Sequence, residues 1–252
     1  MKAVILAAGR GSRMGNLTQD SPKCLVEVAG RSLLSWQIEA LRAASANDVV
    51  LVRGYVKERL VPASVQVLDN PRWEHTNMVG TLLCAAHHLE RDDAIVAYAD
   101  IVYHADIVAA LAAAAGDIVV AYDRLWRDLW CARFEAPLAD AETFETQGGR
   151  LTEIGGRAAE LDDIRGQFMG LMKFTPAGWR RTAAYLAGLV PAERDRLDST
   201  ALLSRLLAAG IEVRTVGVDG RWCEFDNQRD LDVCESMLGG EPGECRWAHD
   251  WR

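Results

Sequence analysis

A loop rich in glycine and arginine, directly after the first apolar run, constrains this chain more than any other feature. Lys2–Ala7 is a short apolar run, and Ala8-Gly9-Arg10-Gly11-Ser12-Arg13-Met14 follows it at once. Such a run is typical of a buried strand, and small residues after it let backbone N–H groups approach an anion. Arg13 adds a planar guanidinium that matches phosphate oxygens. The segment therefore predicts a phosphate site just beyond the end of a strand.

Two common phosphate-binding loops do not fit this segment. A Rossmann fingerprint requires glycine at position 14, where Met14 stands, and a Walker A loop ends in Gly-Lys-Ser/Thr, which is missing here. Ten residues after Arg13, Pro22-Lys23-Cys24-Leu25 places the compact charge of Lys23 on a backbone restricted by proline. A lone Gly-x-Gly would be interpreted as a turn with solvated cations, but the joint pattern is far more specific.

The rest of the chain alternates short apolar runs with helical patterns. The predicted strands cover residues 49–52, 65–68, 94–98, 118–122, 168–174, 213–218 and 222–225. The predicted helices cover residues 32–44, 80–89, 106–115, 176–189, 199–209 and 228–237, with Pro176 and Ser199 as helix starts. This alternation favours a mostly parallel, mixed sheet covered on both faces. We therefore expect one Rossmann-like, three-layer α/β domain over residues 1–252, with its ligands beyond the carboxyl ends of the strands.

The alternation breaks between about residues 125 and 175. Residues 130–134 and 150–154 are predicted to be strands of a hairpin-like excursion, and an acidic segment that ends in Gly148-Gly149 separates them. We therefore expect a small β-rich lid on the main domain. The tail after Gly239 carries no pattern that predicts an element.

Carboxylates follow two of the predicted strands. Asp100 closes the first, and Glu224 and Asp226 stand two residues apart at the end of another. Residues two apart on a strand point to the same face, so Glu224 and Asp226 are expected to project together. Because hard divalent cations take oxygen ligands, these three are candidate metal ligands. The simpler alternatives are a helix cap before Asp106 for Asp100, and a strand end with a helix cap for the pair.

The joint pattern of Leu6 to Met14 with Pro22-Lys23 resembles the signature of the sugar-phosphate nucleotidyltransferase superfamily. The resemblance implies a Rossmann-like fold, a triphosphate-binding loop and Mg²⁺-dependent chemistry. It implies that Lys23 holds the reacting α-phosphate and that Asp100 and Asp226 are the metal aspartates. Many relatives have glycine where Ala99 stands. The nucleotide-binding residues implied in the first part of the chain are Leu6, Ala7, Ala8, Gly9, Gly11, Ser12, Arg13 and Tyr98.

Three later segments look closest to the choline-phosphate and 2-aminoethylphosphonate cytidylyltransferase branch. They are Asn77-Met78-Val79-Gly80-Thr81-Leu82, Gly166-Gln167-Phe168-Met169-Gly170-Leu171 and Trp222-Cys223-Glu224-Phe225-Asp226-Asn227. The resemblance implies CTP as the nucleotide, with its base near Asn77, Met78, Gly80 and Thr81.

Acceptors in this branch often carry a cationic amine, and aromatic faces with a carboxylate suit such a group. Tyr122, Trp126, Asp128 and Trp130 are close together in the sequence and are the candidates, with Gln167 and Gly170 in the same site. The simpler interpretation of each tryptophan is packing in the core or the lid. We expect residues 125–175 to bind the acceptor.

The expected reaction is in-line attack by a phosphate or phosphonate oxygen of the acceptor on the α-phosphorus of CTP, with release of pyrophosphate. The attacking oxygen is already anionic, so no base is needed, and Lys23 and Arg13 would act by positioning and charge stabilisation. One alternative is a sugar-1-phosphate nucleotidyltransferase that uses UTP or dTTP. A second is a catalytically inactive nucleotide-binding regulator. A dinucleotide oxidoreductase fits least, because the third glycine is missing.

Composition limits the partners. The net charge of −8 disfavours nucleic acid as a partner. No run approaches the roughly 18 apolar residues of a membrane helix, and the apolar start is too short for a signal peptide. The six cysteines are scattered without a Cys-x-x-Cys pair, which is typical of reduced thiols. We therefore expect a cytoplasmic protein whose partners are CTP and a small acceptor, with a homodimer left open.

Overall fold

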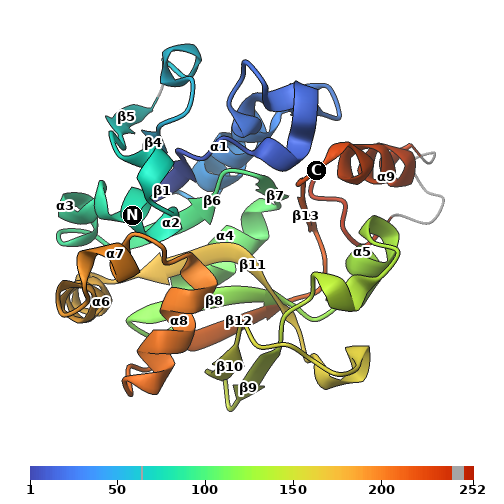
Figure 1. Ribbon diagram of the computed structural model, residues 1–252. Helices are drawn as coiled ribbons and strands as arrows, with labels where there is room; N and C mark the ends of the chain where they lie inside the picture. The colour runs from blue at the N-terminus through green and yellow to red at the C-terminus, as the bar shows by residue number, and fades with distance from the viewer. Residues whose placement is uncertain (64, 240–246) are drawn as a thin grey trace.

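A mixed, mostly parallel sheet forms the centre of the computed structural model, which describes residues 1–63, 65–239 and 247–252 (Figure 1). Within these residues the sheet has nine strands, in the order β5-β4-β1-β6-β11-β8-β12-β10-β9. They are β1 (Lys2–Ala7), β4 (Asp48–Arg53), β5 (Gln66–Asp69), β6 (Ala94–Tyr98), β8 (Ile118–Asp123), β9 (Phe144–Gln147), β10 (Arg150–Ile154), β11 (Gln167–Phe174) and β12 (Arg214–Val218).

The strands that position the site are central and parallel. β1 pairs in parallel with β4 on one side and β6 on the other. β11 is antiparallel to β6 and β8, whereas β12 is again parallel to β8. The carboxyl ends of β1 and β6 therefore meet at one edge of the sheet, and Ala8 and Ala99 directly follow these ends.

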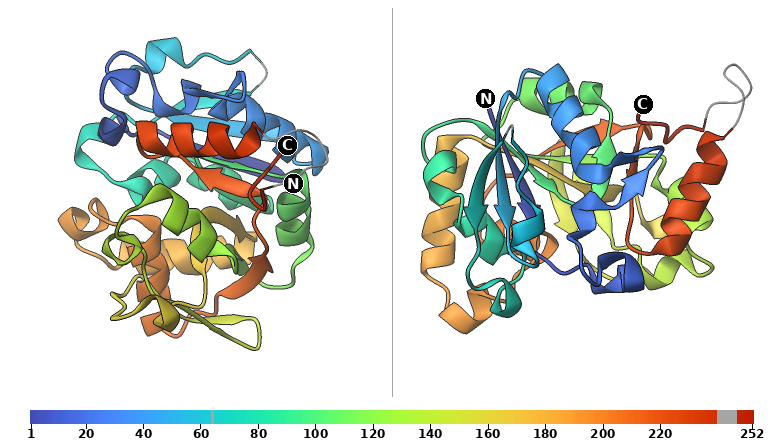
Figure 2. Two further views of the ribbon diagram at one scale, coloured as in Figure 1. Left: turned by 90° about the vertical axis from the view of Figure 1, so that its right-hand side faces the viewer. Right: turned by 90° about the horizontal axis from the view of Figure 1, so that it is seen from above.

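Two layers of helices cover the two faces of this sheet (Figures 1 and 2). Side chains of β1 alternate between two cores, because Ala3, Ile5 and Ala7 enter one and Val4 and Leu6 the other. The first core includes buried residues of α1 (Leu33–Ala43), α4 (Ala105–Ala113), α5 (Trp126–Arg133) and α9 (Gln228–Leu238). The second includes those of α2 (Met78–Leu83), α3 (Ala86–Leu89), α6 (Pro176–Ala187) and α8 (Ser199–Ala208). The structure also contains the short helix α7 (Pro191–Arg194) and the hairpin of β2 (Glu27–Val28) and β3 (Arg31–Ser32).

The prediction of a strand over residues 130–134 is wrong, because this segment forms the end of α5. The buried residues of α5 are Trp126, Leu129, Trp130 and Arg133, a helical spacing of three and four. The bulky aromatic residues favoured a strand locally, and packing against α9 decides for the helix. Residues 150–154 do form a strand, but its hairpin partner is β9, at residues 144–147, and not the segment 130–134.

One of the predicted helices also differs in the structure. The helix predicted over residues 80–89 is two helices, and the first begins after Asn77, whose side chain accepts a hydrogen bond from the backbone N–H of Met78. The predicted starts of α6 at Pro176 and of α8 at Ser199 are confirmed, and the side chain of Asp198 caps α8 by accepting from the backbone N–H of Ala201. In the part of the chain that the structure describes, no helix is long and apolar enough to span a membrane.

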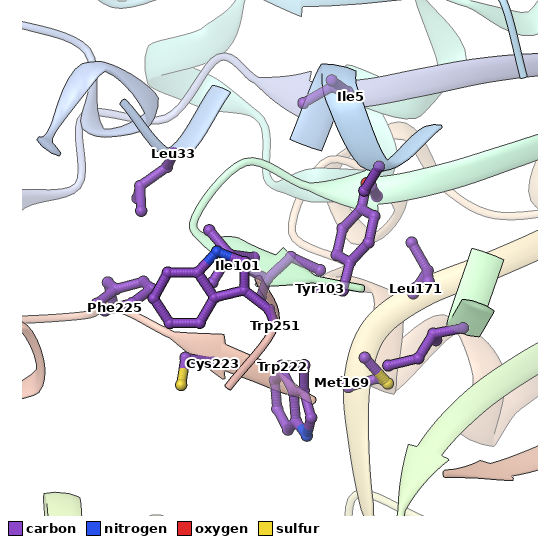
Figure 3. Close-up of a cluster of buried hydrophobic side chains, with 14 of the residues drawn as sticks. Ile5, Leu33, Ile101, Tyr103, Met169, Leu171, Trp222, Cys223, Phe225 and Trp251 are labelled. Carbon is purple, nitrogen blue, oxygen red and sulfur yellow. The ribbon is translucent and has the colours of Figure 1, made fainter. Parts of the chain in front are cut away.

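A second small sheet joins distant parts of the chain beside the main one. β13 (Trp222–Glu224) pairs with β7 (Ile101–Tyr103), and Glu224 lies opposite Ile101. The C-terminal segment packs here, since the ring of Trp251 contacts the ring of Phe225, as Figure 3 shows. This packing holds Glu224 next to the end of β6, where Asp100 stands.

Candidate active site

The N-terminal loop forms one wall of a hollow of about 290 Å³ at the carboxyl ends of β1 and β6. Of the predicted nucleotide-binding residues, all but Gly80 line it: Leu6, Ala7, Ala8, Gly9, Gly11, Ser12, Arg13, Asn77, Met78, Thr81 and Tyr98. Gly80 has another role, because a Cβ there would lie 2.4 Å from the Cβ of Thr76. We call this space the loop hollow.

Gly11 shows why the loop needs glycine at that position. Its φ is +66°, in the left-handed region, and a Cβ on it would lie 2.9 Å from the Cβ of Lys23. The side chain of Lys23 thus runs directly past the backbone of Gly11. Any larger residue at position 11 would displace the lysine.

The ammonium group of Lys23 lies between two carboxylates. Its Nζ donates to Oδ2 of Asp100 at 2.7 Å and to Oδ1 of Asp226 at 2.8 Å. Arg13 Nη2 lies 2.8 Å from the same oxygen of Asp226. Burial would lower the pKa of Lys23, but the two carboxylates outweigh burial and raise it, so the group stays charged.

The three predicted metal ligands come together. Asp100, Glu224 and Asp226 each offer an oxygen, and these oxygens lie within 4.8 Å of one another. The backbone explains this, because the N–H of Phe225 donates to the carbonyl of Asp100 at 2.9 Å. Asp100 Oδ1 is buried without a hydrogen-bond partner among the described residues. An oxygen left in this way, within a carboxylate cluster, fits a hard divalent cation.

A buried arginine that the sequence analysis missed lies behind these carboxylates. Arg133 Nη1 donates to Glu224 Oε2 at 2.8 Å, and its Nη2 donates to Asp226 Oδ2 at 3.2 Å. Its Nε donates to Asp230 Oδ1 at 3.0 Å. The helical spacing of buried residues in α5 was the signal that could have revealed it.

Burial and the charges at this site raise the pKa of Glu224 and lower that of Asp226. Burial, and then the charge of Asp226, raises the pKa of Glu224 to about 7. Burial also opposes ionisation of Asp226, but Lys23, Arg13 and Arg133 outweigh it and lower the pKa. With every group ionised, four carboxylates face three cations among the described side chains, which leaves one negative charge in excess: Asp100, Glu224, Asp226 and Asp230 against Lys23, Arg13 and Arg133.

A second hollow, of about 220 Å³, adjoins the first. Arg13, Met78 and Tyr98 line both, and Glu224 and Asp226 line the second. We call it the acidic hollow. Its other lining residues are Trp130, Asp140, Glu142, Thr143, Phe144, Ile154, Gln167, Phe168, Asp198 and Thr200.

The structure separates the predicted acceptor residues. Trp130 and Gln167 line the acidic hollow, whereas Trp126 and Asp128 line a different one, which Asp162 and Arg165 also line. The ring of Tyr122 stacks on Phe144, with centroids 4.7 Å apart. Gly170 packs behind Tyr98, because a Cβ there would lie 2.6 Å from that ring. Two of the six predicted residues thus face the acidic hollow.

Three carboxylates of the acidic hollow were not singled out from the sequence. Asp140 Oδ2 accepts from the indole N–H of Trp130 at 3.1 Å. Glu142 is held through its backbone, whose N–H donates to the Gln167 side chain at 3.3 Å. Burial, and then the charge of Asp198, raises the pKa of Glu142. The acidic character of residues 136–149 was visible, but nothing in the sequence placed Asp198 beside them.

Comparisons with known proteins agree with this geometry. The family model described as MobA-like NTP transferase domain matches residues 3–159. CTP:phosphoglutamine cytidylyltransferase of Campylobacter jejuni is 36% identical, over 92% of this chain and 98% of its own. A UTP–glucose-1-phosphate uridylyltransferase of Haloferax volcanii is 26% identical, over 96% and 98%. The solved CTP:phosphocholine cytidylyltransferase of Streptococcus pneumoniae has a TM-score of 0.69 at 21% identity, over 94% of this chain and 98% of its own. The predicted fold class is thus confirmed.

Proposed function

The chain belongs to the MobA-like NTP transferase family, and from that premise we propose that it is a CTP-dependent cytidylyltransferase. Its acceptor would be a phosphorylated or phosphonate small molecule that carries an ammonium group. One observation carries the proposal: Lys23, Asp100 and Asp226 form one contact network where the loop hollow meets the acidic hollow. A nucleotide and an acceptor can therefore meet at a shared charged centre.

The choice of CTP is supported by the relatives. The full-length relative at 36% identity is named for CTP and phosphoglutamine. A choline-phosphate cytidylyltransferase of Streptococcus pneumoniae is 46% identical over 23% of this chain. The uridylyltransferase at 26% identity supports the second candidate, a sugar-1-phosphate nucleotidyltransferase. The higher identity over the same length favours the first.

The acceptor class follows from the charge of the acidic hollow. Asp140, Glu142 and Asp198 line it, and Arg13 alone among its described lining residues is a cation. The aromatic rings of Trp130, Phe144 and Phe168 line the same space. Carboxylates and aromatic faces favour an ammonium group. Phosphoglutamine, phosphocholine and 2-aminoethylphosphonate all carry a cationic nitrogen, so they fit this hollow.

The residues of the chain have distinct tasks in the proposed reaction. Arg13 and the loop backbone bind the triphosphate, and Lys23 moves from its carboxylates to the α-phosphate. An oxygen of the acceptor attacks the α-phosphorus, the bond to the β-phosphate breaks, and pyrophosphate leaves. Because the attacking oxygen is anionic, the residues act by orientation and charge stabilisation. Asp100, Asp226 and Glu224 would hold Mg²⁺, which offsets negative charge on the reacting phosphates.

A panel of nucleotides and acceptors, read by release of pyrophosphate, tests the proposal. We expect turnover with CTP and at least one of phosphocholine, 2-aminoethylphosphonate and phosphoglutamine. UTP or dTTP with glucose 1-phosphate should be far slower. Equal turnover with UTP and glucose 1-phosphate would establish the second candidate instead. Nucleotide binding without turnover of any pair would favour an inactive regulator.

A further inference from the structure

We propose that Arg133 is a positioning residue that orients the metal-binding carboxylates, an inference that rests on the proposed function. Its side chain is 1% exposed, so no substrate reaches it, and its guanidinium contacts three carboxylates at once. Two of them, Glu224 and Asp226, are proposed metal ligands, and the third, Asp230, lies in the first turn of α9. Arg133 would therefore act on the metal only through these residues.

In each of the two proposed metal ligands, one carboxylate oxygen contacts Arg133 and the other does not. Asp226 gives Oδ2 to Arg133 and Oδ1 to Lys23 and Arg13. Glu224 gives Oε2 to Arg133, which leaves its Oε1 for a cation. The arginine thus holds one oxygen of each carboxylate and leaves the other for a cation. Outer groups of this kind fix the orientation of metal ligands and tune their affinity.

Asp230 links Arg133 to the backbone of Asp226. It accepts from Arg133 Nε at 3.0 Å, and its Oδ2 accepts from the backbone N–H of Asp226 at 2.6 Å. The same oxygen accepts from the N–H of Asn227 at 3.1 Å, as part of the capping box of α9. Arg133 therefore fixes both the carboxylate and the backbone of Asp226.

Only arginine suits this position. Its planar fork reaches three carboxylates in three directions, whereas a lysine ammonium is a single point charge. The rings of Trp130 and Phe134 lie 5.2 and 4.9 Å from its guanidinium carbon and hold the fork in place. Because Trp130 also lines the acidic hollow, one side chain supports both the metal site and the acceptor wall.

The test compares Arg133→Lys with Arg127→Lys, a control in the same helix whose arginine pairs with the exposed Asp162. Titration with Mn²⁺ alone, followed by electron paramagnetic resonance, measures metal affinity without turnover. We expect R133K to raise the Mn²⁺ Kd by about 10- to 100-fold, as loss of outer support to metal ligands does. Its kcat should fall by about the same factor, with the KM for CTP changed by less than about threefold. R127K should match the wild type in all three measurements.

A wild-type Mn²⁺ Kd in folded R133K, with or without a lower Tm, would overturn the proposal and leave Arg133 a purely structural role. Should R133K fail to fold, Asp230→Asn carries the test, because asparagine keeps an oxygen for the backbone N–H of Asp226 but weakens the anchor of Arg133. A several-fold higher Mn²⁺ Kd in D230N would support the proposal, and an unchanged Kd would refute it. A wild type that binds Mn²⁺ but turns over no CTP would refute only the proposed function.

Discussion

The loop hollow and the acidic hollow adjoin but are built in different ways. Most of the loop hollow comes from two continuous segments, residues 6–13 and 76–81, and the backbone of small residues forms much of its wall. The acidic hollow collects side chains from many separate segments, from Arg13 in the N-terminal loop to Asp226 after β13. A phosphate site can thus be encoded locally, whereas a site for a variable acceptor depends on tertiary packing.

The largest expected effect comes from a substitution in the network of Lys23, Asp100 and Asp226, where the two hollows meet. Asp100→Asn should reduce kcat by about 10³-fold, because it removes a charge that offsets Lys23 and a ligand for the metal. Circular dichroism should show an unchanged fold, since Asp100 is partly exposed and lies after a strand. Mg²⁺-dependent turnover at the wild-type rate would refute the metal assignment.

Lys23→Ala should affect chemistry and metal binding in opposite directions. We expect kcat to fall by about 10²- to 10³-fold, because the charge on the α-phosphate is lost. Mn²⁺ measured without nucleotide should bind more tightly, because Lys23 no longer occupies the space between Asp100 and Asp226. Pyrophosphate release and Mn²⁺ titration measure the two effects. An unchanged kcat would contradict the role given to the lysine.

The third prediction distinguishes acceptor binding in the acidic hollow from nucleotide binding in the loop hollow. Glu142→Gln should raise the KM for the acceptor by about tenfold, the loss of one ionic contact to an ammonium group, with little change in the KM for CTP. Asp128→Asn is the matched control, because Asp128 lines a different hollow. Steady-state kinetics with each substrate varied in turn give the comparison. If D128N raised the acceptor KM and E142Q did not, the original sequence prediction would hold instead.

The smallest expected effect is a pH dependence of the metal-free protein. The folded-state pKa of Glu224 is raised to about 7, above its ordinary value. Its contribution to stability is therefore fully present below the ordinary value and is lost as the pH rises through 7. We expect the Tm of the wild type in EDTA to fall as the pH rises from the ordinary pKa of glutamate to about 7. The Tm of Glu224→Gln should fall less over the same range. A Tm profile identical in both proteins would contradict the pKa shift.

The difference between the hollows also explains how far the sequence could be interpreted. Gly11 and Lys23 were predicted because the glycine conformation and the passing lysine are encoded within one short motif. Arg133 was missed because the aromatic residues around it favour a strand, and only packing against α9 makes that segment helical. Glu142 and Asp198 were missed because residues 56 positions apart in the chain meet only after folding.

The identity of the reaction product is the most direct test of the proposed cytidylyltransferase activity. The wild-type protein is incubated with Mg²⁺, CTP, UTP and an equimolar mixture of phosphocholine, 2-aminoethylphosphonate, phosphoglutamine and glucose 1-phosphate, and the nucleotide products are identified by mass spectrometry. We predict that the dominant product is a CDP- or CMP-linked compound that carries an ammonium group. A UDP-sugar as the dominant product, or no new nucleotide at all, would contradict it.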